Sequence, residues 1–164
     1  MKNSNEELQR RIAMKDLELK IPPLLVVVIC MLDMLILRWL FPSLSFQLTG
    51  WWSLGSFLLG CLIALLGVVE FRRHRTSVHP VQVEKSTAVV RSGIYRVTRN
   101  PMYVGMCLWL LAFGFYLENW LSLVMLPVFI AYITQFQIKP EERFLLAKFG
   151  AEYQHYMDSV RRWL

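Results

Sequence analysis

Two short polar motifs carry the side chains of this chain that could perform chemistry. The first is Arg99-Asn100-Pro101, which an apolar run follows directly. Asn favours the N-cap of a helix and Pro its first turn, so a helix should begin here. A helix N-terminus offers free backbone N–H groups and a positive dipole end, which both favour an anionic ligand. The same residues also fit a capped helix flanked by a snorkelling arginine, with no ligand.

The second motif is Pro140-Glu141-Glu142. The proline predicts a helix start, and the two carboxylates then fall in the first helical turn. Paired carboxylates beside a membrane could bind a ribose diol or a cation. Two acids in a first turn also complement the helix dipole without any further role. The local sequence leaves both interpretations open.

Composition indicates which elements must position these motifs. Of the 164 residues 55% are hydrophobic and only 18% are charged, whereas a soluble domain has roughly 45–50% and about 25%. Crossing ~30 Å of hydrocarbon takes about 20 residues of helix. Four apolar segments come near that length, at 21–41, 54–71, 101–117 and 120–138. We therefore expect an all-α integral membrane bundle of four transmembrane helices, with the third helix tilted or shielded because it is short.

The positive charge follows these four segments. Five Lys and Arg lie in residues 1–20, seven in 72–100 and five after 138, but none in 42–53 or 118–119. The positive-inside rule then places both termini and the 72–100 loop in the cytoplasm. This topology accounts for the net charge of +6, so nucleic acid is not an expected partner. The basic flanks would instead meet membrane lipid headgroups.

The chain divides into three expected parts. Residues 1–20 should form an amphipathic cytoplasmic segment, residues 21–71 hold the first two transmembrane helices, and residues 72–164 hold both motifs. Aromatic and apolar residues then recur at helical spacing and predict a C-terminal amphipathic helix: Phe149, Tyr153, Tyr156, Val160 and Trp163. The three cysteines lie apart and no histidines cluster, so no metal site is expected.

The wider pattern around the motifs resembles a known family. Gly93-x-Tyr95-x-x-x-Arg99-Asn100-Pro101-Met102-Tyr103-x-Gly105 is followed by Pro140-Glu141-Glu142-x-x-Leu145 and Phe149-Gly150-x-x-Tyr153-x-x-Tyr156. The pair is similar to the isoprenylcysteine carboxyl methyltransferase and phospholipid N-methyltransferase superfamily, and Thr76-Ser77-Val78-His79-Pro80 looks like its bacterial branch. The resemblance covers about residues 72–160. It implies methyl transfer from S-adenosylmethionine to a hydrophobic or membrane-associated acceptor at the cytoplasmic face.

The resemblance also implies roles for individual residues. Cofactor-binding positions would be Tyr95, Arg99, Asn100, Pro101, Tyr103, Gly105, Glu141, Glu142 and Tyr153, among which Arg99, Asn100 and Glu142 would serve catalysis. His79 and Gln135 would face the acceptor. Many family members carry His where this chain has Asn100, and an amide cannot titrate near neutral pH.

Other interpretations remain beside the methyltransferase. A membrane reductase with a nicotinamide cofactor resembles the same C-terminal motifs, and a non-catalytic membrane scaffold could keep the fold. An isoprenylcysteine carboxylate, a lipid amine and a thiol all stay open as acceptor. We expect an integral protein of the bacterial inner membrane, and a homo-oligomer is left open, since Gly55, Gly60 and Gly67 could allow close helix approach.

Overall fold

The computed structural model describes residues 18–48, 50–73 and 89–164. The segment 1–17 and the loop 74–88, which contains His79 and the adjoining motif, lie outside the described residues. Within the described ranges the chain is helical, and its sole β-type pairing is an isolated bridge between Ser45 and Asn119. The prediction of an all-α fold is confirmed.

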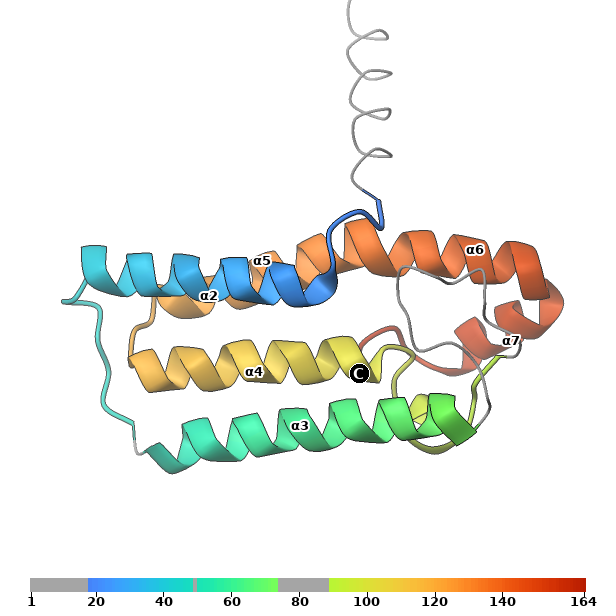
Figure 1. Cartoon of the computed structure of the whole chain (residues 1–164), viewed down its shortest axis with the longest axis horizontal. Coiled ribbons are helices and arrows are strands. Elements are labelled where there is room, and N and C mark those ends of the chain that lie inside the picture. The colour runs from blue at the N-terminus through green and yellow to red at the C-terminus, as the bar shows by residue number, and fades with distance from the viewer. Residues whose placement is uncertain (1–17, 49, 74–88) are drawn as a thin grey trace, which may run out of the picture.

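Long apolar helices build the bundle (Figure 1). They are α2 (Pro23–Leu40), α3 (Gly50–Arg73), α4 (Pro101–Leu117) and α5 (Met125–Ile133), and α5 continues through the π-helical turn η4 (Thr134–Ile138) into α6 (Lys139–Phe149). Among the described residues, α2, α3 and the continuous helix Ser122–Phe149 are long and apolar enough to cross a membrane. α4 is apolar but shorter, at 17 residues, as the sequence indicated.

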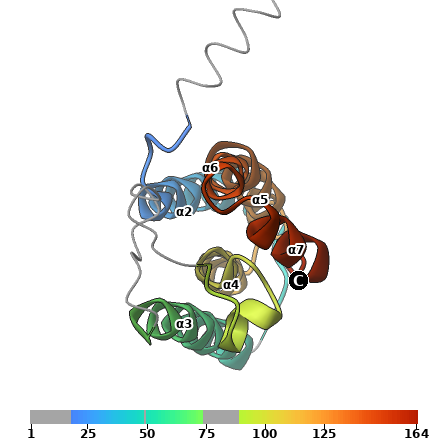
Figure 2. The same ribbon diagram turned by 90° about the vertical axis from the view of Figure 1, so that its right-hand side faces the viewer.

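α4 lies at the centre of the bundle. Figure 2 shows it between α3 on one side and the pair of α2 and α5 on the other. Its contact with α3 is close because glycines face each other: a Cβ on Gly105 would lie 2.7 Å from the carbonyl oxygen of Gly60. On the other side of α4, the fully buried Met34, Leu110 and Phe129 form the apolar core with their neighbours.

Pro140 lies in the first turn of α6, as the sequence indicated, but the chain is already helical before it. A proline removes the amide that would bond the carbonyl four residues earlier, here that of Phe136. The π-helical turn ends just before Pro140, and the Phe136 carbonyl accepts a hydrogen bond from the Leu19 amide at 3.0 Å. The proline therefore leaves a carbonyl available to bind the segment that leads into α2.

The C-terminal segment is not one amphipathic helix. Gly150 has φ +54° and separates α6 from α7 (Ala151–Ser159). A positive φ suits glycine because it has no Cβ, and the chain turns sharply there. Val160 and Trp163 follow the end of α7, so the helical spacing of the aromatic stripe does not reflect a single helix.

The turn between α4 and α5 is tight, as expected. Glu118 takes a left-handed conformation with φ +50° at the end of α4, and a short helix η3 (Ser122–Val124) leads into α5. The fully buried Asn119 donates a hydrogen bond to the Phe41 carbonyl at 2.9 Å. This turn thereby ties the far end of α4 to the end of α2.

Candidate functional site

The two polar motifs meet at one end of the bundle. Arg99 precedes α4, Glu142 lies in the first turn of α6, and Nη2 of Arg99 donates to Oε1 of Glu142 at 2.8 Å. The two side chains are only 8% and 9% exposed. Burying both charges carries a large desolvation cost, which is offset only where further hydrogen bonds satisfy them. The remaining atoms of this pair therefore need partners.

Arg162 supplies most of those partners. Its Nε donates to Oε1 of Glu142 at 3.0 Å and its Nη2 to Oε2 at 2.7 Å, so two guanidinium groups share one carboxylate. These hydrogen bonds raise the pKa of Arg162. Arg99 also donates from Nη1 to the Met157 carbonyl at 2.8 Å. Its buried Nε has no hydrogen-bond partner among the described residues.

The backbone around Arg162 holds the first motif in place. The Arg161 carbonyl accepts from the Arg99 amide at 3.1 Å, and the Arg162 carbonyl accepts from Nδ2 of Asn100 at 2.9 Å. Trp163 donates from its indole to Oγ1 of Thr134 at 3.1 Å. We call residues 160–163 the C-terminal strap. The sequence interpretation missed Arg162, which it counted only as a flanking charge.

Asn100 occupies the N-cap position of α4, as predicted, but its side chain makes no capping hydrogen bond. Its amide instead reaches the strap. The backbone N–H of Asn100 donates to Oγ1 of Thr98 at 3.1 Å, and Thr98 is almost fully buried. Asn100 thus links α4 to the strap, a contact that local sequence could not reveal.

Glu141 makes a separate contact with α4. The Tyr103 hydroxyl donates to Oε1 of Glu141 at 2.6 Å, and Tyr103 is buried. Pro101, at the first position of α4, packs against Gly67, and Gly105 packs against Gly60, so these two motif residues face α3. The two neighbouring glutamates therefore have different partners: Glu142 accepts from two arginines, and Glu141 accepts from a tyrosine.

Three buried tyrosines lie beside the Arg99 pair. The Tyr156 hydroxyl donates to the Tyr95 carbonyl at 2.8 Å, which fastens α7 to the short helix η2 (Gly93–Arg96). Burial raises the pKa of Tyr95, Tyr153 and Tyr156, so all three stay neutral at physiological pH. A cavity of about 70 Å³ opens among them, lined by Phe71, Val89, Val90, Tyr95, Arg99, Leu145, Tyr153 and Tyr156.

Of the two residues expected to face an acceptor, only Gln135 lies among the described residues. Oε1 of Gln135 accepts from Nζ of Lys139 at 2.8 Å in an exposed contact. Its neighbour Gln137 is fully buried, donates to the Ile21 carbonyl at 2.7 Å, and leaves Oε1 without a partner among the described residues. His79 falls in the segment that the structure does not describe.

A family model described as phospholipid methyltransferase matches residues 48–152. The chain belongs to this family. The matched region contains η2, α4 and the first turn of α6, so it spans both polar motifs and the contacts between them. Arg162 and the rest of the strap lie beyond it. Membership in the family and the apolar helices together identify an integral membrane protein.

Two relatives of the chain carry methyltransferase names. The protein-S-isoprenylcysteine O-methyltransferase of Saccharomyces cerevisiae is 31% identical over 140 residues, 79% of this chain and 57% of the yeast protein. A probable enzyme of the same name from Oryza sativa subsp. indica is 31% identical over 135 residues, 82% of this chain and 71% of the rice protein. An uncharacterized protein of Haemophilus influenzae is 48% identical over 63 residues, 38% of this chain and its own full length.

Proposed function

We propose that the chain transfers a methyl group from S-adenosylmethionine to a hydrophobic or membrane-associated acceptor. One observation carries the proposal: the two motifs of a methyltransferase family, far apart in sequence, converge through Arg99–Glu142 and Tyr103–Glu141 at one end of an apolar bundle. Ligand sites in helical bundles commonly lie between the helices, where a few polar groups converge.

The residues at this end fit such a cofactor. The buried Nε of Arg99 is a cationic donor without a partner among the described residues, which suits the cofactor's carboxylate. Glu141, held through one oxygen by Tyr103, offers a carboxyl group for the ribose or amino group. Tyr95 and Tyr153 line the adjoining cavity with aromatic surface. Glu142 is engaged by both arginines and so acts as a positioning residue that fixes Arg99.

Methyl transfer requires little from the protein beyond positioning of the cofactor and the acceptor. S-adenosylmethionine supplies an electrophilic methyl group on a sulfonium, and in-line displacement depends on orientation and a dry path. An ionised carboxylate acceptor would need no base, whereas a lipid amine or a neutral thiol would have to lose a proton. Asn100 cannot take that proton. A carboxylate acceptor, of the kind named for the yeast relative, therefore fits this chain best.

The acceptor and the cofactor would approach from different sides. The Arg99 end of the bundle adjoins the three basic segments of the sequence, so we place it at the cytoplasmic face. The apolar surfaces of α2 and α3, which carry many exposed Leu, Val and Phe side chains, face the bilayer. A lipid-like acceptor can reach the site by this route while the water-soluble cofactor enters from the cytoplasm.

Calorimetric titration of the purified protein tests the proposal. S-adenosylhomocysteine should bind, and Glu141→Gln should weaken that binding about tenfold, equivalent to ~1.4 kcal/mol. Glu152→Gln is the matched control, because among the described residues Glu152 forms only an exposed ion pair with Arg91. Binding of a reduced nicotinamide instead would favour the reductase, and binding of neither would favour a scaffold.

Transfer of a labelled methyl group tests the acceptor. The purified protein with labelled S-adenosylmethionine should label a farnesylated cysteine with a free carboxylate, and the methyl ester of the same compound should stay unlabelled. Labelling of a lipid amine from membrane extracts, with no labelling of the farnesylated cysteine, would show that the acceptor is an amine and not a carboxylate.

A further inference from the structure

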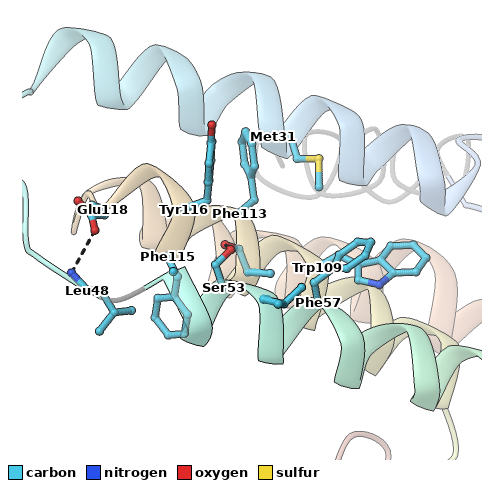
Figure 3. A pocket seen from close by; sticks show the side chains of 12 residues that line it. Met31, Leu48, Ser53, Phe57, Trp109, Phe113, Phe115, Tyr116 and Glu118 are labelled. Carbon is cyan, nitrogen blue, oxygen red and sulfur yellow. Dashed lines mark hydrogen bonds between the residues drawn. The ribbon is translucent and has the colours of Figure 1, made fainter.

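A second cavity lies at the opposite end of the bundle from Arg99. It is a groove of about 570 Å³ between α2 and α3, and α4 forms its floor (Figure 3). α4 contributes the rings of Trp109, Phe113 and Tyr116, α3 contributes Phe57, and α2 contributes Met31. This groove has no part in the proposed methyl transfer, and none of the motif residues lines it.

The charged side chain of the groove, Glu118, lies at one end of it. Oε1 of Glu118 accepts a hydrogen bond from the Leu48 amide at 3.1 Å, as the dashed line in Figure 3 marks. The hydroxyl of Ser53, further along the groove, already donates to the Ala112 carbonyl at 2.8 Å. The remaining lining is mostly aliphatic and aromatic, so the groove combines one charged end with an apolar body.

Glu118 lies at the same end of the bundle as Arg38 but does not pair with it. Among the described residues Glu118 forms no ion pair, and the sequence has no Lys or Arg between Arg38 and Arg72 or between Arg99 and Lys139. Arg38, at the end of α2, donates instead to the Pro42 carbonyl at 3.1 Å. A carboxylate without an ion-pair partner among the described residues, at the end of an apolar groove, favours a cationic, hydrogen-bond-donating group attached to a chain.

The dimensions of the groove match one leaflet. The stretch of α4 from Trp109 to Glu118 rises about 13 Å at ~1.5 Å per residue. Half of a bilayer's hydrocarbon is about 15 Å thick. Glu118 stands at the end of α4, next to the exposed Trp120, and tryptophan favours the headgroup level of a membrane. A chain lying in the groove would therefore run inward from the membrane surface.

We propose that this groove binds one acyl chain of a phospholipid whose primary ammonium headgroup pairs with Glu118. The lipid is not the methyl acceptor. Its nitrogen lies at the Glu118 end of α4, about 25 Å from the Arg99 end at ~1.5 Å per residue. The bound lipid fills the groove between α2 and α3.

Native mass spectrometry of the full chain in detergent tests the proposal. Titration with phosphatidylethanolamine should give a one-lipid complex about two- to fivefold more populated than phosphatidylglycerol of the same chains, as expected for one exposed ion pair. Glu118→Gln should abolish this preference, because the amide keeps an oxygen for the Leu48 amide but loses the charge. Glu152→Gln on α7 should keep it. Equal binding of both lipids by the natural chain would overturn the proposal.

A second variant tests the groove independently of the charge. Leu54 lines the groove and is 46% exposed, so Leu54→Trp should fill the space and reduce binding of both lipids at least severalfold. Thermal unfolding in detergent establishes that each variant is folded. If the main species is instead a lipid-free dimer, and Leu54→Trp dissociates it into monomers, a second copy of the chain covers the groove. That result would also overturn the proposal.

Discussion

Arg162 binds both oxygens of the Glu142 carboxylate, with hydrogen bonds of 3.0 Å to Oε1 and 2.7 Å to Oε2. Arg99 adds a third at 2.8 Å. The carboxylate is thus held from two segments that belong to different parts of the sequence, one before α4 and one after α7. The position of Arg99, and with it the first motif, depends on a residue that neither motif contains.

Replacing Arg162 with Ala should destabilise the protein. Glu142 would lose two of its three hydrogen bonds, and because Arg162 is 34% exposed, solvent screening limits the expected loss to about 1–2 kcal/mol. Thermal unfolding in detergent measures it. Arg161→Ala is the control, since the Arg161 side chain is exposed and only its backbone carbonyl bonds Arg99. Equal unfolding temperatures for the two variants would contradict the role assigned to Arg162.

Removing the Tyr103 hydroxyl should affect cofactor binding more than folding. Tyr103→Phe frees Glu141 from its 2.6 Å hydrogen bond, so the carboxylate loses its orientation. We expect S-adenosylhomocysteine to bind about three- to tenfold more weakly, equivalent to ~0.7–1.4 kcal/mol. Calorimetry checks the affinity. Unchanged affinity in this variant would argue against Glu141 as a ligand to the cofactor.

Tyr132 provides a matched control for that experiment. Its hydroxyl is also buried but has no hydrogen-bond partner among the described residues. Tyr132→Phe should leave the affinity unchanged and should be neutral or stabilising by up to about 1 kcal/mol, because an unsatisfied polar group is removed.

Alkaline titration should show that the buried tyrosines beside Arg99 resist ionisation. Burial raises the pKa of Tyr95, Tyr153 and Tyr156 above the ~10 of an unfolded chain. Their contribution to stability is then present in full below about pH 10 and is lost as the pH rises towards their folded values. Absorbance near the phenolate band should therefore show these three tyrosines ionising only as the protein unfolds. Ionisation of the three below the unfolding pH would contradict this prediction.

The close approach of α3 and α4 predicts opposite effects for two glycine substitutions. Gly105→Ala should destabilise the bundle by at least about 1–3 kcal/mol, because its Cβ would lie 2.7 Å from backbone oxygen of Gly60. Gly55→Ala, on the same helix as Gly60, meets nothing within 4 Å and should be stabilising by up to about 1 kcal/mol through helix propensity. Thermal unfolding of the pair measures the difference, and equal effects would show that the helices are not in contact at Gly105.

Much of the bundle could be predicted from local sequence. Apolar runs identified the membrane helices, and Pro101 and Glu118 mark the two ends of α4 as expected. Pro140 lies in the first turn of α6 as expected, but local sequence did not reveal the preceding π-helical turn, whose Phe136 carbonyl accepts a hydrogen bond from the Leu19 amide. Gly150 breaks the aromatic stripe that helical spacing alone had joined.

The sequence by itself determined which residues are apolar for long enough to span a membrane and which two motifs carry charge beside them. Those features depend on hydropathy and local backbone preference, which neighbouring residues set. Only the tertiary structure decided that Glu142 is shared by Arg99 and Arg162 while Glu141 is held by Tyr103. Adjacent glutamates look alike in a sequence. Their side chains diverge because the first turn of a helix points them towards different neighbours, and those neighbours come from distant segments.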